Sequence, residues 1–180
     1  MHTIAKKVIE MYLNEQKIPT IDELWVWSHP ENLTKKLSFV TLYKDGKIIA
    51  SSWRINAKKA NTIAELIENA LFCLKDPRFI EAIKNPLEIR SVKFRVDIIA
   101  DSQRRILNSI DEFDITKNWA IILSQTLWKA GVILPNIANL VSTPRDLFEL
   151  VCRKADIDPS TVKEEDYYLY AIESDQYNDF

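Results

Sequence analysis

The sequence predicts an α+β fold in which helices pack on a mostly antiparallel sheet. Two runs of β-forming residues, 37–43 and 48–55, flank Lys44-Asp45-Gly46-Lys47, and Asp-Gly between such runs is a strong signal for a tight hairpin. Helical patterns and further strand patterns follow without the regular alternation of a parallel βαβ sheet. These observations favour an antiparallel sheet with helices over a doubly wound fold.

The N-terminal segment reads as a helix followed by a turn. Apolar residues recur at helical spacing over 3–15 with charged residues between them, which predicts an amphipathic helix. Pro19 ends this helix, because proline restricts the residue before it. Thr20 and Glu23 have the spacing of a capping box, although Pro30 limits any helix that follows.

Two more helices are predicted after the hairpin. Thr62 and Glu65 read as a second capping box, which opens a helix that runs to about Lys75 with its apolar residues on one face. Asp76 then caps a short helix that has Pro77 at its first position, where proline's missing N–H has no helical partner to lose.

The C-terminal half supplies further strands and one helix. Residues 92–98 alternate apolar with charged side chains, which is typical of a half-buried strand. Residues 119–124 and 166–172 read as two more strands, the last with aromatic residues on both faces. Thr143 caps a helix that runs over about 144–155.

Length and composition fit one intracellular domain. The chain has 180 residues, 47% hydrophobic and 28% charged, so we expect residues 1–180 to form a single domain with room for a minor lobe. The start lacks the apolar core of a signal peptide, and no apolar run approaches the ~20 residues of a membrane helix. Cys73 and Cys152 fall within helical patterns and read as small core residues. We expect a cytoplasmic location and no membrane partner.

Glycine and histidine are too scarce for several common sites. Gly46 and Gly131 are the only glycines, and a phosphate-cradling loop needs several close together. His2 lies at the terminus, which leaves His29 as the sole candidate for a fixed histidine base. The acids of 111–114 lack the spacing of a calcium loop. No cofactor and no metal are predicted.

Basic residues concentrate between Lys35 and Lys59. This stretch holds seven Lys or Arg residues against one acid, Asp45. A solvated basic edge is the simplest interpretation. The alternative is a nucleic-acid-binding module in which Trp53 and Arg54 stack on bases. The net charge of −2 argues against nucleic acid as a partner.

Four segments carry a family resemblance. They are Phe39-Val40-Thr41-Leu42 with Lys44 and Gly46, Glu68-Asn69-Ala70 with Lys75-Asp76-Pro77-Arg78-Phe79, the run from Gly131 to Ala138, and the run from Leu150 to Ala155. In this order and spacing they resemble the motifs of the AMMECR family, the AmmeMemoRadiSam system protein A-like proteins, over nearly the whole chain. The resemblance implies an α+β fold with a main antiparallel sheet and a smaller lobe. It implies no established activity, and it suggests Memo-like and radical SAM proteins as partners.

The chain departs from the family at its hallmark. Leu-Arg-Gly-Cys-Ile-Gly would follow the hairpin glycine, whereas residues 48–53 read Ile-Ile-Ala-Ser-Ser-Trp. Ser51 stands where the resemblance places the cysteine, and a serine hydroxyl is a far poorer nucleophile at neutral pH than a thiol. Arg54 is the residue that could replace the charge of the lost arginine from a shifted position.

Three hypotheses about function follow. The leading one is a divergent, non-catalytic AMMECR-like protein that binds a partner or a small ligand. The first alternative is an enzyme of a Memo and radical SAM pathway, whose cleft would be lined by Ser51, Arg54, Arg78 and Asn136. The second alternative is a nucleic-acid-binding module that uses residues 35–59. A site near Ser51 requires the four side chains of the cleft to converge in space.

Overall fold

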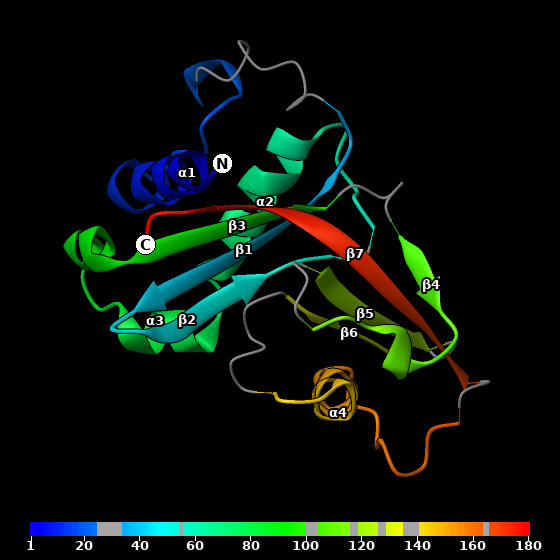
Figure 1. Ribbon diagram of the computed structural model, residues 1–180. Coiled ribbons are helices and arrows are strands. Elements are labelled where there is room, and N and C mark those ends of the chain that lie inside the picture. The colour runs from blue at the N-terminus through cyan, green and yellow to red at the C-terminus, as the bar shows by residue number, and fades with distance from the viewer. Residues whose placement is uncertain are drawn as a thin grey trace. The chain divides into compact units, whose positions relative to one another are not determined.

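The computed structural model divides the chain into two units (Figure 1). Unit 1 contains Met1–Ile98 and Asp175–Phe180, and unit 2 contains Ile99–Ser174. The residues that the structure describes are 1–24, 34–54, 56–99, 104–115, 119–125, 129–134, 141–163 and 166–180. The expectation of a single domain over 1–180 with a minor lobe stays a prediction.

Unit 1 is a sheet with helices. Its elements are α1 (His2–Glu15), η1 (Asp22–Leu24), β1 (Leu37–Lys44), β2 (Lys47–Ser52), α2 (Thr62–Cys73), α3 (Pro77–Ala82), η3 (Pro86–Ser91), β3 (Lys93–Ile99) and the end of β7 (Tyr167–Asn178). The strand order is β2-β1-β3-β7, and β1 pairs with β2 in antiparallel register. This order puts β2 at an edge of the described sheet.

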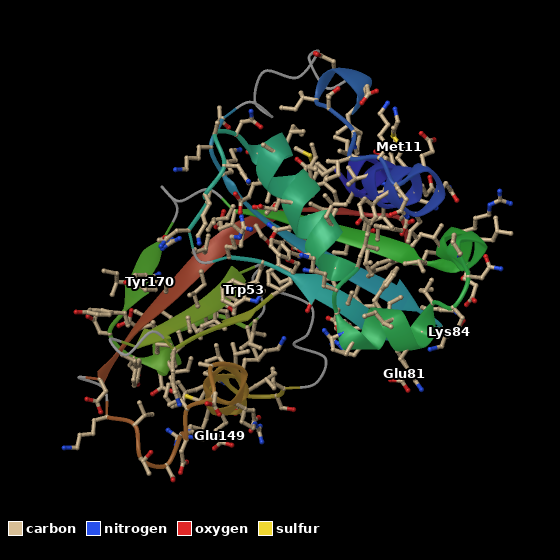
Figure 2. The ribbon with its side chains drawn as sticks, turned by 180° about the vertical axis from the view of Figure 1, so that it is seen from behind. Met11, Trp53, Glu81, Lys84, Glu149 and Tyr170 are labelled. Atoms are coloured by element: carbon tan, nitrogen blue, oxygen red, sulfur yellow. The ribbon has the colours of Figure 1, made fainter. Side chains whose placement is uncertain are left out.

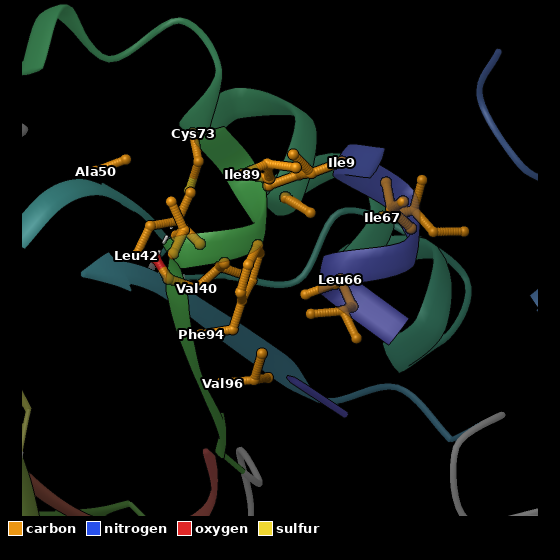
Figure 3. Packing of buried hydrophobic residues seen from close by; sticks show 14 of the residues in the cluster. Ile9, Val40, Leu42, Ala50, Leu66, Ile67, Cys73, Ile89, Phe94 and Val96 are labelled. Carbon is orange, nitrogen blue, oxygen red and sulfur yellow. Dashed lines mark hydrogen bonds between the residues drawn. The ribbon is translucent and has the colours of Figure 1, made fainter. Parts of the chain in front are cut away.

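The core of unit 1 joins its sheet to α1 and α2. Val40, Leu42 and Phe94 of the strands gather with Ile9 and Leu66 of the helices (Figure 3). All five side chains are fully buried. Burying one such side chain stabilises the fold by about 1.5–3 kcal/mol. This cluster therefore fixes α2 on the sheet, and with it one wall of the site described below.

The hairpin and the first capping box form as predicted. Asp45 and Gly46 have φ of 50° and 75°, the left-handed geometry that a two-residue hairpin turn needs. The Thr20 amide donates to Glu23 Oε2 at 2.9 Å, and the Glu23 amide donates to Thr20 Oγ1 at 3.3 Å. β2 ends at Ser52, earlier than the predicted end at residue 55.

The cap of α2 differs from the prediction. Asn61 is the N-cap residue, and its side chain accepts the amide of the third helical residue at 2.9 Å. Thr62 is the first helical residue. Glu65 cannot close a capping box because it is buried and accepts the amides of Lys58 and Lys59 at 3.0 and 2.9 Å. The capping box predicted at Thr62 and Glu65 was therefore wrong, and the N-cap lies one residue earlier.

The strand predicted over 92–98 is confirmed as β3, but it is buried on both faces and not half-buried. Arg95 and Asp97 on the charged face of β3 are 4% and 0% exposed. Arg95 Nε and Nη2 donate to Asp97 at 2.8 and 2.9 Å. Two charges in an interior are tolerated only when they are paired in this way. The alternation correctly predicted which side chains of β3 share a face, but it did not predict that the charged face is buried.

Unit 2 is a second sheet region with one α-helix on it. Its elements are β4 (Arg105–Leu107), η5 (Ile110–Glu112), β5 (Trp119–Gln125), β6 (Ala130–Ile133), α4 (Pro144–Lys154) and the greater part of β7. β5 pairs with β6 and with β7, and β4 pairs with β7, all antiparallel. Thr143 and Asp146 form the capping box that opens α4, which confirms the predicted start of this helix.

Gly131 permits the close approach of α4 to β6. A Cβ at this position would lie 2.5 Å from the carbonyl oxygen of Val151. A side chain at residue 131 would therefore push on helix backbone, which cannot turn aside as a flexible side chain can.

Cys73 and Cys152 are buried and free, as predicted.

Helices and antiparallel strands in both units confirm the predicted α+β class. The strands over 119–125 and 167–178 are confirmed, and the second is longer than predicted. β4 and β6 were not predicted; they are short and have few β-forming residues. Within the described ranges, no helix is long and apolar enough to cross a membrane.

Candidate functional site

A pocket of about 500 Å³ opens in unit 1, where β2 ends beside the junction of α2 and α3. Its walls are Ser51, Ser52, Trp53, Arg54, Phe72, Lys75, Asp76 and Pro77. Trp53 is labelled in Figure 2, just past the end of β2. Pockets of roughly 300–1,000 Å³ commonly hold small molecules. The size is therefore suitable for a metabolite.

Asp76 organises one wall of this pocket. Its Oδ1 accepts the Arg78 amide and Nε, both at 3.0 Å, which caps α3 as the sequence predicts. Its Oδ2 accepts Arg78 Nη2 at 2.7 Å and the Ser51 amide at 3.3 Å. The last bond satisfies an N–H of the edge strand β2. Hydrogen bonds from the Arg78 guanidinium lower the pKa of the Asp76 carboxyl.

Ser51 is held by its hydroxyl as well as by its amide. Arg78 Nη2 donates to Ser51 Oγ at 3.3 Å. Asp76 bonds the Ser51 amide and not the hydroxyl, and its lowered pKa makes it a weak base. Because its oxygen accepts from Arg78, the Ser51 hydroxyl keeps its proton to donate, and these contacts do little to activate it as a nucleophile.

Arg54 is fixed by two carboxylates of α2. Its Nη1 lies 3.3 Å from Glu65 Oε1 and also pairs with Glu68. Lys59 Nζ lies 3.1 Å from the other oxygen of Glu68. The hydrogen bond from Arg54 lowers the pKa of the Glu68 carboxyl. The charge of Arg54 is thus neutralised within unit 1, and its guanidinium lines the pocket in a fixed position.

A buried hydrogen-bond chain fixes the end of β2. Ser52 Oγ donates to Asn69 Oδ1 at 3.1 Å. Asn69 Nδ2 donates to the carbonyl oxygen and to Oγ of Ser38, each at 2.9 Å. Asn69 is fully buried, so each of these bonds offsets the cost of removing its amide from water. The residue joins α2 to both strands of the hairpin.

Two cations lie against an exposed aromatic ring in the pocket. Arg54 Cζ and Lys75 Nζ are 5.2 and 5.1 Å from the centroid of Phe72, which is 40% exposed. Trp53 stacks parallel to Phe39, with centroids 6.0 Å apart and planes at 2°. Among the described residues, no carboxylate pairs with Lys75. The pocket therefore combines aromatic surface with one cation that is not neutralised.

Two other described side chains of unit 1 carry a thiol or an imidazole: Cys73, which follows the wall residue Phe72, and His2, which lies outside the pocket walls. Cys73 Sγ donates to the Val40 carbonyl at 3.7 Å, and burial raises the pKa of its thiol to about 12. Burial also lowers the pKa of His2, which lies at the chain terminus. His29 lies outside the described residues. Within the described segments, no group of three His, Cys, Asp or Glu side chains is placed to hold a metal ion.

Three of the four predicted cleft residues come together. Ser51 and Arg54 line the pocket, and Arg78 reaches Ser51 Oγ from beside it. Asn136 lies outside the described residues. Their part in any function stays a prediction, because geometry alone does not test it.

Phe72 and Lys75 were not among the predicted cleft residues. They stand three positions apart at the end of the predicted helix, a spacing that puts two side chains on one helical face. That spacing was the sequence pattern that could have pointed to these two residues. What the sequence lacked was any sign that this face meets the end of β2, since that contact joins residues far apart in the chain.

The basic stretch 35–59 is partly used inside unit 1. Lys44 Nζ donates to the Ala82 carbonyl at 2.9 Å and to Glu88 at 2.5 Å. Arg54 and Lys59 pair with glutamates of α2. Three of its basic side chains are therefore neutralised or hydrogen-bonded internally, which leaves fewer cations for a nucleic-acid backbone.

Comparison with known proteins places the chain in a family. The AMMECR1 family model matches residues 2–177. The chain is also similar to the crystal structure of an uncharacterised protein from Pyrococcus horikoshii, with a TM-score of 0.75 and 17% sequence identity. That match covers 99% of this chain and 89% of the other. No curated protein matches the sequence. At this identity the structural match shows the fold alone.

Proposed function

This chain belongs to the AMMECR1 family, and we propose that it is a divergent, non-catalytic member that binds a small ligand in the pocket at Ser51. The observation that carries the proposal is the bonding around Ser51. Its hydroxyl accepts from Arg78, and the nearest carboxylate, Asp76, is held on the amide. The surroundings favour a positioned donor over a nucleophile.

The rest of the pocket supports binding on the same grounds. Arg54, Asp76 and Asn69 are each fixed by several hydrogen bonds or ion pairs. Rigid, satisfied walls reduce the entropy that a protein loses when it binds a ligand. Phe72 adds apolar surface that a ligand can cover. A preorganised pocket of this kind needs no reacting group to be useful.

The enzymatic alternative draws on the same convergence. Ser51, Arg54 and Arg78 meet at one pocket, which an enzyme of a Memo and radical SAM pathway would also need. A fluorophosphonate probe separates the two, because it labels serines that a base activates. We expect no label at Ser51 by peptide mass spectrometry. Stoichiometric labelling at this residue, lost in Ser51→Ala, would replace the binding proposal with the enzymatic one.

Binding itself is tested by a fragment screen followed by ¹⁵N amide shifts. We expect shifts to gather at Ser51, Phe72 and Lys75, and to weaken in Ser51→Ala. A matched variant, Ser91→Ala, changes a serine of η3 outside the pocket walls and should leave the shifts unchanged. Fragments that bind only elsewhere, or equally to both variants, would sink the proposal of a ligand site at Ser51.

Memo-like and radical SAM proteins are proposed as partners on family context, and a cytoplasmic location belongs to the same proposal. Pull-down with such proteins encoded beside this chain is the direct check of the partners.

The nucleic-acid alternative predicts binding to single-stranded RNA that weakens steeply with salt. We expect no binding at low salt, because internal contacts hold part of the basic stretch.

A further inference from the structure

We infer that the pocket at Ser51 takes a small organic anion, with a carboxylate or phosphoryl group at Lys75 and Ser51 and an apolar body against Phe72. The ligand class rests on the proposed function, because it concerns the same pocket. It is carried by three properties of the walls, which are hydrogen-bond polarity, charge and exposed apolar surface.

The polar groups of Ser51, Asp76 and Lys75 offer donors rather than acceptors. Both oxygens of Asp76 are already occupied, by Arg78 and by the Ser51 amide. Because Ser51 Oγ accepts from Arg78, its hydroxyl proton is left to donate. Lys75 contributes an ammonium with three donors. Carboxylate and phosphoryl oxygens accept hydrogen bonds without donating any, so they match this set better than an alcohol or an amine does.

Charge pairing around the pocket leaves a surplus cation. Arg54 and Lys59 pair with Glu65 and Glu68, and Arg78 pairs with Asp76. Lys75 has no such partner in the described parts of the chain, and its ammonium is held over Phe72 by the ring. An anion beside Lys75 would complete the pairing. A cationic ligand would meet an uncompensated like charge.

The apolar side of the pocket sets the rest of the ligand. Phe72 is 40% exposed, although its size and its place at the end of α2 would suit a core position. A ligand that covers this ring recovers roughly 25 cal/mol per Å² of apolar surface removed from water. The volume of about 500 Å³ holds a body larger than a bare inorganic ion. The ligand is therefore an organic anion rather than free phosphate.

The test is titration of the whole chain with matched probes, followed by ¹⁵N amide shifts. Phenyl phosphate and benzoate present an anion on a ring, benzyl alcohol presents the ring alone, and inorganic phosphate presents the anion alone. We expect the two organic anions to bind most tightly, with shifts at Ser51, Phe72 and Lys75. Benzyl alcohol and inorganic phosphate should each bind at least about tenfold more weakly than the two organic anions, since each lacks one group of contacts.

Substitutions at Lys75 test whether its ammonium group binds the anion. Lys75→Ala should weaken phenyl phosphate about tenfold, Lys75→Arg should restore most of the affinity, and Lys47→Ala at the far end of β2 should change nothing. A dispersed amide spectrum and an unchanged melting temperature establish that each variant is folded. Benzyl alcohol binding as tightly as phenyl phosphate, or Lys75→Ala binding like wild type, would overturn the anion assignment and leave the pocket proposal standing. Absence of shifts in the pocket with every probe would overturn both.

Discussion

Replacement of Asp76 by alanine removes three contacts at once. The α3 cap is lost, which costs about 1 kcal/mol. The Ser51 amide at the sheet edge loses its acceptor, which costs about 1 kcal/mol when water replaces it poorly. The pair with Arg78 adds only about 0.5 kcal/mol, because that side chain is half exposed and screened. We expect Asp76→Ala to lower the free energy of unfolding by about 2–3 kcal/mol.

Asp76→Asn separates the charge from the cap. Asparagine caps helices as well as aspartate does, but its single carbonyl oxygen cannot replace both carboxylate oxygens. This variant should therefore keep the cap and lose about 1.5 kcal/mol from the Ser51 amide and the pair with Arg78. Urea unfolding followed by circular dichroism measures both changes, and Asp175→Ala on the exposed part of β7 is the control. Exchange of the Ser51 amide should also accelerate in Asp76→Ala. An alanine variant within about 0.5 kcal/mol of wild type would refute the central place given to this carboxylate.

The contribution of Asp76 depends on pH with a definite sign. The folded-state pKa of its carboxyl lies below the unfolded value. Its stabilisation is therefore fully present above the unfolded pKa and is lost as pH falls through the folded pKa. The stability difference between wild type and Asp76→Asn should shrink in acid and disappear below the folded pKa. A difference that grows on acidification would contradict the assigned contacts.

Three further predictions concern the interior. Gly131→Ala should destabilise unit 2 by about 1–3 kcal/mol in urea, because its Cβ would meet the Val151 carbonyl; a neutral effect would mean that α4 can move away freely. Asp97→Ala should cost about 3–5 kcal/mol by removing the carboxylate that accepts two hydrogen bonds from the buried Arg95, and a loss under 1 kcal/mol would show that water reaches the guanidinium. The Cys73 thiol should resist Ellman's reagent until denaturant is added, since burial raises its pKa to about 12; rapid native labelling would contradict this.

Local rules were enough for much of the fold. The Asp45-Gly46 turn and the Thr143 cap each depend on a few adjacent residues, and both were predicted correctly. The cap of α2 failed because a buried contact claimed Glu65 for other amides. The burial of Arg95 could not be predicted either, since a charged face reads as solvent-facing until its covering elements are known.

The residues of the candidate site were likewise predicted only in part. Ser51, Arg54 and Arg78 could be chosen from motif positions near the hairpin and the short helix. Phe72 and Lys75 could not, because nothing within residues 62–75 indicates that the end of α2 and the residues after it border the end of β2. Contacts between distant segments decide which helical face becomes a wall, and one sequence without its packing does not contain them.

A crystal of the protein soaked with phenyl phosphate tests the central claim most directly. We predict intact phenyl phosphate in the pocket, with its phosphoryl oxygens at Lys75 Nζ and Ser51 Oγ and its ring against Phe72. Either an empty pocket under saturating ligand or a phosphoryl group bonded covalently to Ser51 would contradict a non-catalytic anion-binding site.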